Sequence, residues 1–204
     1  MKSRSDELRA LFLEDLKKDK TFAALDPVEQ ERLCREAEES GVRYACSVRE
    51  QVPEPDFLEL RKWLLGEGIT VMKLDTKYQL PYIAEYEETK KRITLYTRRI
   101  NDMQRALSIV HPEYFGTHPL ETLCLAHETF HHLEKKDHRT TGRLIWTDTK
   151  LLGLLPVRHY YAEGSEIAAH VFVSELLDLP YSPYTLVDEA VAVWNEEKEK
   201  RNAE

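Results

Sequence analysis

The segment that most constrains the fold is His127-Glu128-Thr129-Phe130-His131. Two histidines four residues apart lie on one face of an α-helix, because four residues make just over one helical turn. Both imidazoles can then reach one metal ion, and zinc is the ion that such a pair usually holds. The glutamate after the first histidine projects beside that ion, where it can take a proton from metal-bound water. The motif therefore requires a helix here and a third ligand from elsewhere in the chain.

The residues around the motif predict a partly buried amphipathic helix. Pro119 suits the first helical position. The preceding residue His118, or Thr117, can cap the N-terminus of this helix. A single histidine on a buried face is more often a hydrogen-bonded core residue than a ligand, but a pair flanking a glutamate favours metal binding. We interpret His132, which lies well round the helix, as a flanking polar residue. One face of the helix is formed by Leu120, Leu123, His127, His131 and Glu134.

The third ligand is expected from a second helical segment, Tyr161 to Phe172. The three cysteines are scattered and show no zinc-knuckle spacing, which leaves His, Asp or Glu. We assign Glu166 as the third ligand, just after a cap at Ser165, and His170 as a partner on the same face that orients a ligand. Glu163 is the competing candidate. Glu166 also has an alternative interpretation, as a first-turn carboxylate favoured by the helix dipole.

These segments resemble the ImmA/IrrE-type metallopeptidases. The resemblance covers roughly residues 60 to 180 and includes the motif, the segment from Glu166 to Leu177 and a strand-like stretch at Ile93 to Tyr96. It implies a gluzincin-like zinc site on a small α+β catalytic domain that cleaves regulatory proteins such as phage or stress-response repressors. Phe130 replaces the family's usual Gly and is expected to narrow the space beside the metal. His170 replaces the usual Asn and changes the surroundings of the ligands.

Composition limits the class of protein further. A chain of 204 residues with 42% hydrophobic and 32% charged residues can bury the core of one globular domain. The net charge of −8 argues against a general nucleic-acid-binding or anionic-membrane surface. The sequence has no apolar run of membrane-spanning length and no apolar signal core near Met1, so we expect a cytoplasmic protein.

The pattern along the chain predicts an α+β fold. Residues 1–65 are expected to form a helical segment packed on the core, residues 66–185 a zincin-like core with two ligand-bearing helices, and residues 186–204 a C-terminal helix and charged tail. In the first segment, helices are expected over residues 5–20, from Asp26 to near Gly41, and from Asp56 to Gly66 or Gly68.

The middle of the chain alternates apolar and polar residues and predicts a small three-stranded antiparallel sheet. Its strands are expected at residues 69–74, 80–86 and 92–97, followed by a helix from Asn101 to Val110. Residues 135–159 are expected to contain a lid or a short hairpin. The candidate strand for pairing with an extended substrate consists of Ile93, Thr94, Leu95 and Tyr96, although it is equally an ordinary sheet strand.

Together these features predict a zinc-dependent endopeptidase. His127, His131 and Glu166 would hold Zn²⁺, and Glu128 would act as the base. The candidates for the oxyanion donor are Tyr161, which we place first, and Tyr160, His159 and His170, although ordinary packing is the favoured interpretation of any single one. The expected partner is a protein or peptide substrate such as a transcriptional regulator, with no direct contact to nucleic acid or membrane. The alternatives are a catalytically silent metallopeptidase-like regulatory or interaction module and a zinc hydrolase of non-peptide bonds.

Overall fold

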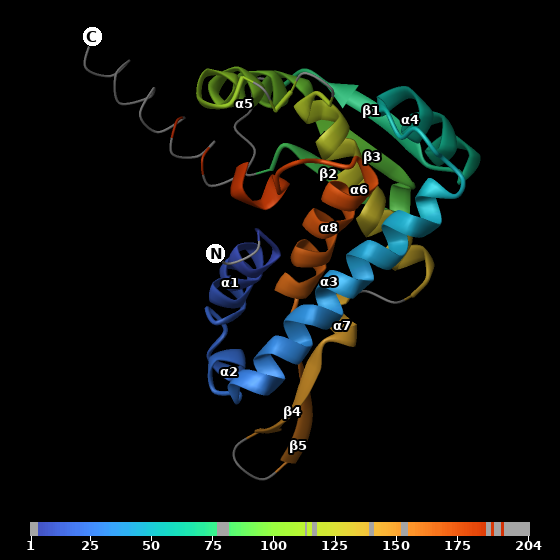
Figure 1. Cartoon of the computed structure of the whole chain (residues 1–204). Helices are drawn as coiled ribbons and strands as arrows, with labels where there is room; N and C mark the ends of the chain where they lie inside the picture. The colour runs from blue at the N-terminus through green and yellow to red at the C-terminus, as the bar shows by residue number, and fades with distance from the viewer. Residues whose placement is uncertain are drawn as a thin grey trace.

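The computed structural model describes residues 4–76, 82–112, 114–115, 118–138, 141–151, 155–186, 189 and 193 (Figure 1). The described part of the chain is a mixed α+β fold in which helices predominate. The expected C-terminal helix and tail, residues 186–204, lie almost wholly outside it. The elements are α1 (Arg4–Leu16), α2 (Lys20–Ala23), α3 (Pro27–Arg49), α4 (Phe57–Gly66), β1 (Thr70–Leu74), β2 (Ala84–Glu87), η1 (Glu88–Lys90), β3 (Arg92–Tyr96), α5 (Thr97–Val110), α6 (Leu120–Lys136), α7 (Thr141–Leu144), β4 (Trp146–Leu151), β5 (Leu155–Tyr160) and α8 (Glu163–Leu176).

Helix α3 starts where the sequence predicts but does not end there. The Asp26 side chain accepts hydrogen bonds from two backbone N–H groups of the first turn, and Pro27 takes the first position. The helix then continues through Gly41 to Arg49, so the expected end near Gly41 is wrong. A Cβ added at Gly41 would lie 2.4 Å from the backbone oxygen of Ala168. Gly41 therefore marks the close crossing of α3 and α8, which run side by side in Figure 1.

The three-stranded sheet is mixed rather than antiparallel. Strand β3 lies in the middle, parallel to β1 on one side and antiparallel to β2 on the other. The expected antiparallel arrangement fails because the chain leaves β1, crosses to the far edge to form β2, and returns to the middle through a tight turn in which Lys91 has φ 47°. The strand proposed for substrate pairing, Ile93 to Tyr96, is thus central and both its edges are occupied. The prediction of an exposed strand there is wrong, and β2 is the edge strand on that side.

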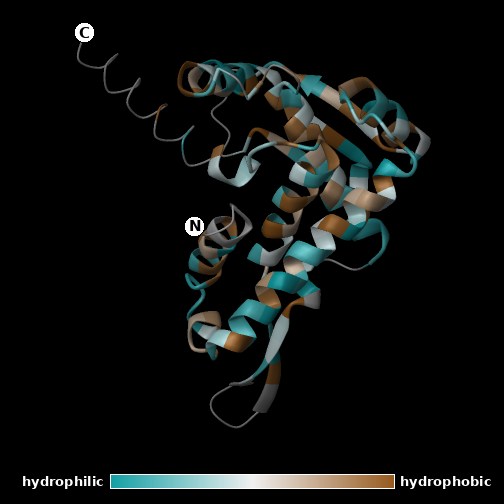
Figure 2. Ribbon diagram, viewed as in Figure 1, coloured by the Kyte–Doolittle hydropathy of each residue, from teal (hydrophilic) through white to brown (hydrophobic). Residues whose placement is uncertain are grey.

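The buried apolar side chains form two clusters, and α3 contributes to both. The larger cluster joins the sheet to α4, α5, α6 and α8 and receives Tyr44, Ala45 and Val48 from α3. The smaller one joins α1, α2 and the first half of α3 to the start of α8. Figure 2 shows hydrophobic and hydrophilic segments alternating along α3 and α8, as expected of helices with one buried side. The helical segment at the N-terminus is therefore part of the packing that positions α8.

The stretch expected to form a lid or hairpin contains the antiparallel pair β4–β5, with Trp146 opposite Tyr160 at its base. In Figure 1 this pair projects from the end of the molecule opposite the three-stranded sheet. Within the described residues, no helix has both the length and the apolar character needed to cross a bilayer.

Candidate metal centre

Helix α6 carries the motif and is fixed at its start by a contact from another helix. It begins at Leu120 with Pro119 in the capping position, and no side chain caps it locally. Instead, the Leu120 N–H donates a 2.9 Å hydrogen bond to Oε1 of Gln104 on α5. The expected cap at His118 is therefore wrong, and Thr117 lies outside the described residues. A tertiary contact replaces the local cap that the sequence suggested.

The three predicted ligands converge on one point. Nε2 of His127 lies 3.1 Å from Nε2 of His131, and the two Glu166 carboxylate oxygens lie 3.3 Å from His127 Nε2 and 3.5 Å from His131 Nε2. Ligand atoms bound at about 2.0–2.1 Å to a tetrahedral ion are about 3.3 Å apart. The two ring nitrogens and the carboxylate group thus have separations close to those that a single small cation requires.

His170 belongs to the same cluster, although not in the expected way. Its ring nitrogen, with the donor atoms of His127 and Glu166, forms a group within 4.8 Å that can hold a metal ion. Burial and the neighbouring His127 lower the pKa of His170 to about 3. Its Nδ1 is buried and has no hydrogen-bond partner among the described residues. The predicted role of orienting a ligand through a hydrogen bond is therefore not seen.

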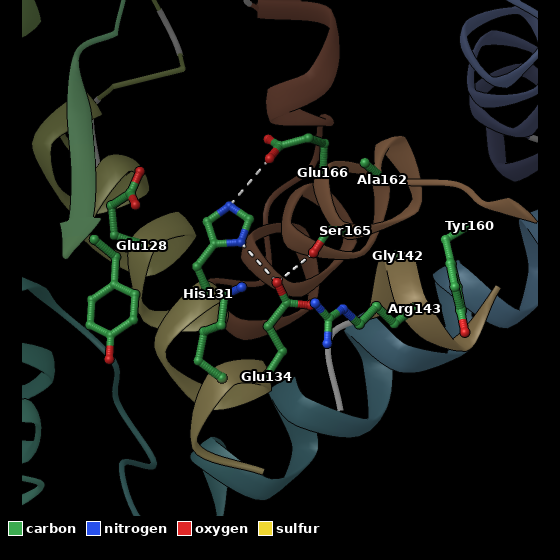
Figure 3. Close-up of a pocket in the computed structure, with 11 residues that line it drawn as sticks. Glu128, His131, Glu134, Gly142, Arg143, Tyr160, Ala162, Ser165 and Glu166 are labelled. Atoms are coloured by element: carbon green, nitrogen blue, oxygen red, sulfur yellow. Dashed lines mark hydrogen bonds and ion pairs between the residues drawn. The ribbon is translucent and has the colours of Figure 1, made fainter. Parts of the chain in front are cut away.

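The carboxylate that orients a predicted ligand is Glu134, which sequence reasoning left without a role. Its side chain is 1% exposed, and its Oε1 lies 3.2 Å from His131 Nδ1. The backbone N–H of Thr141 donates to its other oxygen at 2.8 Å, and the Ser165 hydroxyl donates to Oε1 (Figure 3). A buried carboxylate on the second ring nitrogen fixes the orientation of a metal-binding histidine and its tautomer.

This network also corrects the interpretation of α8. Ser165 is inside the helix, which begins at Glu163, so it is not the cap, and Ala162 in the capping position forms no side-chain bond. The detectable signal for Glu134 was its place on the buried face of α6, three residues after His131. Burial opposes ionisation of Glu134, but its bonds to His131, Ser165 and Thr141 outweigh this and lower its pKa.

Glu128 lies beside the converging ligands. The residue is 8% exposed and, with His131 and Glu166, lines two adjacent cavities. Burial raises the pKa of Glu128, although the neighbouring His127 and His131 and a hydrogen bond from the backbone N–H of Tyr86 on β2 act in the opposite direction. It forms no ion pair with a lysine or arginine of the described chain. A carboxylate held in this way can accept and release a proton next to the centre.

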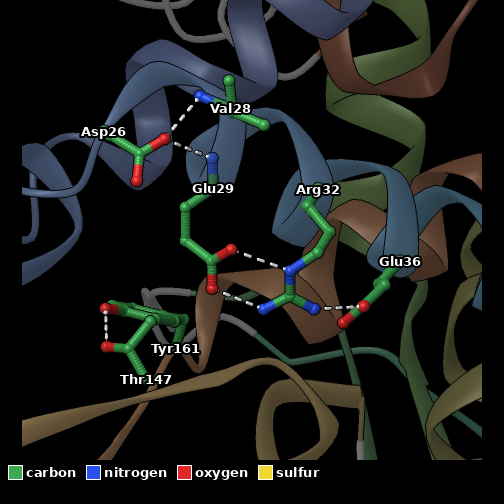
Figure 4. Close-up of polar contacts among 7 residues, drawn as sticks. All are labelled: Asp26, Val28, Glu29, Arg32, Glu36, Thr147 and Tyr161. Carbon is green, nitrogen blue, oxygen red and sulfur yellow. Dashed lines mark hydrogen bonds and ion pairs between the residues drawn. The ribbon is translucent and has the colours of Figure 1, made fainter.

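Tyr161, the predicted oxyanion donor, lies elsewhere. Its side chain is fully buried in the smaller apolar cluster, and its hydroxyl is 2.7 Å from Thr147 Oγ1 (Figure 4). It lines neither cavity at the centre, so the predicted catalytic position of Tyr161 is wrong. The neighbouring Tyr160, the last residue of β5, is exposed and lines the first cavity.

Two further sequence interpretations can be compared with the structure. Glu163, the competing ligand, is exposed and lies outside the metal-binding group. Phe130 is fully buried against Tyr44 and Phe172 and lines neither cavity, so it does not narrow the space beside the centre as expected.

The two cavities differ in the residues that border them. The first, of about 550 Å³, is bordered by the polar or charged side chains of Glu134, Lys135, Arg143 and Tyr160. The second, of about 590 Å³, runs between β2, α5, α6 and α8 and has Met103, Leu107, Leu120, Leu123, Cys124 and Val173 in its wall. Tyr86, Glu128, His131 and Glu166 border both. The candidate centre therefore lies where the two cavities meet, and after these bordering residues we name the first the polar cavity and the second the apolar cavity.

Comparison of the chain with protein-family models, with curated proteins and with solved structures gave no match. The geometry of the site is thus the basis for its functional interpretation.

Proposed function

We propose that this protein is a zinc-dependent endopeptidase. The observation that carries the proposal is the convergence of His127 Nε2, His131 Nε2 and the Glu166 carboxylate, with separations of 3.1, 3.3 and 3.5 Å. Two imidazoles and one carboxylate form a usual ligand set of catalytic zinc, which leaves one position open. Glu128 beside this set distinguishes a hydrolytic arrangement from a purely structural one.

The chain's own residues support this chemistry. Glu134 would hold the His131 ring with Nε2 directed at the ion. Zinc bound there would supply Lewis acidity toward water and toward a scissile carbonyl. Glu128 would take the proton from the attacking water and deliver it to the leaving nitrogen. Burial raises the pKa of Glu128, which strengthens its affinity for the proton that it would take from water.

Strand β2 offers a backbone edge to an extended substrate. Glu85 lies opposite Thr94 of β3, and the Tyr96 N–H donates to the Ile83 carbonyl, so odd-numbered residues of β2 face β3. Ala84 and Tyr86 therefore direct their backbone groups to the outer side, as the Tyr86 N–H bond to Glu128 indicates. An extended peptide that added to this edge would pass directly beside the centre.

The two cavities suggest which side chains the substrate carries. The residues that precede and begin β2, Tyr82 to Ala84, border only the apolar cavity, whereas Tyr86 borders both. A substrate antiparallel to β2 would run from the polar cavity to the apolar one. It would then place a large apolar residue after the scissile bond and a polar or acidic residue before it, near Lys135 and Arg143. A protein segment of this kind, such as one in a transcriptional regulator, is the proposed substrate.

The test combines zinc analysis with cleavage of a peptide library. Wild-type protein should contain about one zinc per chain and cleave peptides with a large apolar residue after the scissile bond. Glu128→Gln should keep the zinc but lower cleavage by at least about 10²-fold, because only the base is lost. His127→Ala should lose the metal. Full activity of the Glu128→Gln protein, or stoichiometric zinc in the His127→Ala protein, would contradict the proposal.

A second candidate is a catalytically silent metallopeptidase-like regulatory or interaction module. One observation favours it, namely the position of His170, whose ring nitrogen lies close enough to help fill the open position. Stoichiometric zinc without cleavage of any library peptide, by the wild type or by any variant that opens the centre, would support this candidate over the peptidase.

A further inference from the structure

His170 lies against the predicted ligands from a position on α8 one turn after Glu166. Its ring packs edge-to-face on the His127 ring with centroids 5.0 Å apart. A ring nitrogen lies within 4.8 Å of the donor atoms of His127 and Glu166, whereas ligands of one ion are about 3.3 Å apart. The nitrogen is therefore close enough to these two donors to belong to the same metal-binding group.

One ring nitrogen of His170 has no partner. Nδ1 is buried without a hydrogen-bond partner among the described residues. The ring makes edge-to-face contacts with the rings of His127 and Tyr184, the latter at 5.3 Å between centroids. A buried polar atom without a partner is costly, and coordination of a cation is one way in which an imidazole is satisfied.

His170 also lines the apolar cavity next to the centre, together with Val173 and Leu186. A substrate side chain that occupied this cavity would contact His170. The residue is thus positioned both to occupy a coordination position and to be displaced by an incoming substrate.

From this geometry we propose that His170 is a fourth, displaceable protein ligand that closes the metal centre until substrate enters the apolar cavity. The inference rests on the proposed zinc site formed by His127, His131 and Glu166, and it adds a resting state in which no position is open. A site with four protein ligands is the arrangement of structural zinc, so the resting protein would bind zinc tightly and hydrolyse slowly.

The experiment counts imidazole ligands by X-ray absorption on the zinc-loaded protein. Wild type should show three imidazoles, and His170→Phe, which keeps a ring of similar size without nitrogens, should show two. His170→Ala is the second variant, in case the larger ring disturbs packing. His138→Asn is the matched control, because His138 is exposed and has φ 54°, a conformation that Asn tolerates. The control should keep three imidazoles.

Binding of acetohydroxamate, which needs open coordination positions, gives an independent measurement. Calorimetry should show at least about tenfold tighter binding to His170→Phe than to wild type, because no protein ligand has to leave. Two imidazoles in both proteins, or equal hydroxamate affinity, would overturn the role of His170 and leave the proposed peptidase intact. If the wild-type protein did not bind about one zinc ion per chain, the proposed function itself would be overturned.

Discussion

Helix α8 packs against α3 on one side and α6 on the other, and the two interfaces are built differently. Against α3 the contact depends on a close backbone approach, with Gly41 over the Ala168 carbonyl. Against α6 it depends on polar side chains, since Ser165 donates to Glu134 and Glu166 reaches both motif histidines. One interface sets the position of α8, and the other uses that position for chemistry. Substitutions at the two should therefore separate stability from metal binding.

The largest effect is expected from Glu134→Ala. The substitution removes the acceptor for Thr141, Ser165 and His131, and the unsatisfied buried groups should lower the free energy of unfolding by about 3 kcal/mol or more. Zinc affinity should fall by about 10–100-fold, because the His131 ring loses its orienting carboxylate. Urea denaturation and competition with a chelator measure the two quantities.

Glu175→Ala is the matched control for this substitution, since Glu175 is exposed on α8 and should change neither quantity appreciably. Unchanged zinc affinity in a folded Glu134→Ala protein would remove Glu134 from the metal centre and make the polar interface an ordinary packing contact.

Gly41→Ala tests the other interface. Alanine alone would favour an α-helix by about 1 kcal/mol over glycine. Its Cβ, however, would lie 2.4 Å from a backbone oxygen, so α3 and α8 must separate, and we expect a net loss of about 1–3 kcal/mol in unfolding free energy. The variant should still bind one zinc per chain, because no polar contact to α6 is removed.

Gly66→Ala is the control, since a Cβ there meets nothing within 4 Å and the change should be neutral or slightly stabilising. If Gly41→Ala were as stable as wild type in thermal unfolding, the close approach would not determine the position of α8.

The sequence predicted the convergence of His127, His131 and Glu166 better than it predicted the packing around them. The spacing of the two histidines fixes their relative position, because a helix places residues four apart on one face. Glu166 was predicted from its position beside an apolar helical stripe, and its carboxylate lies 3.3 and 3.5 Å from the two ring nitrogens. Local periodicity was sufficient where one helix contains the information.

Non-local features were missed for physical reasons. Gly41 looked like a helix end, because its role depends on a backbone oxygen 127 residues later in the chain. The central position of β3 depends on a strand order that alternation of side chains does not encode. The sequence placed Glu134 on the buried face of α6. Its hydrogen-bond partners Thr141 and Ser165 come from α7 and α8, so its role was not predicted. Such features follow only once the elements are placed in space.

The smallest effect is expected from Tyr161→Phe, which separates the two tyrosines that the sequence could not distinguish. Tyr161 contributes a buried hydroxyl bonded to Thr147, so its loss should reduce the free energy of unfolding by about 1 kcal/mol. Zinc content and cleavage rate should stay unchanged, because the ring lies in the smaller cluster away from the centre. Tyr160→Phe is the counterpart, and its exposed hydroxyl should leave unfolding within about 0.5 kcal/mol of wild type. A large loss of cleavage in a stable Tyr161→Phe protein would contradict this placement and return Tyr161 to the catalytic machinery.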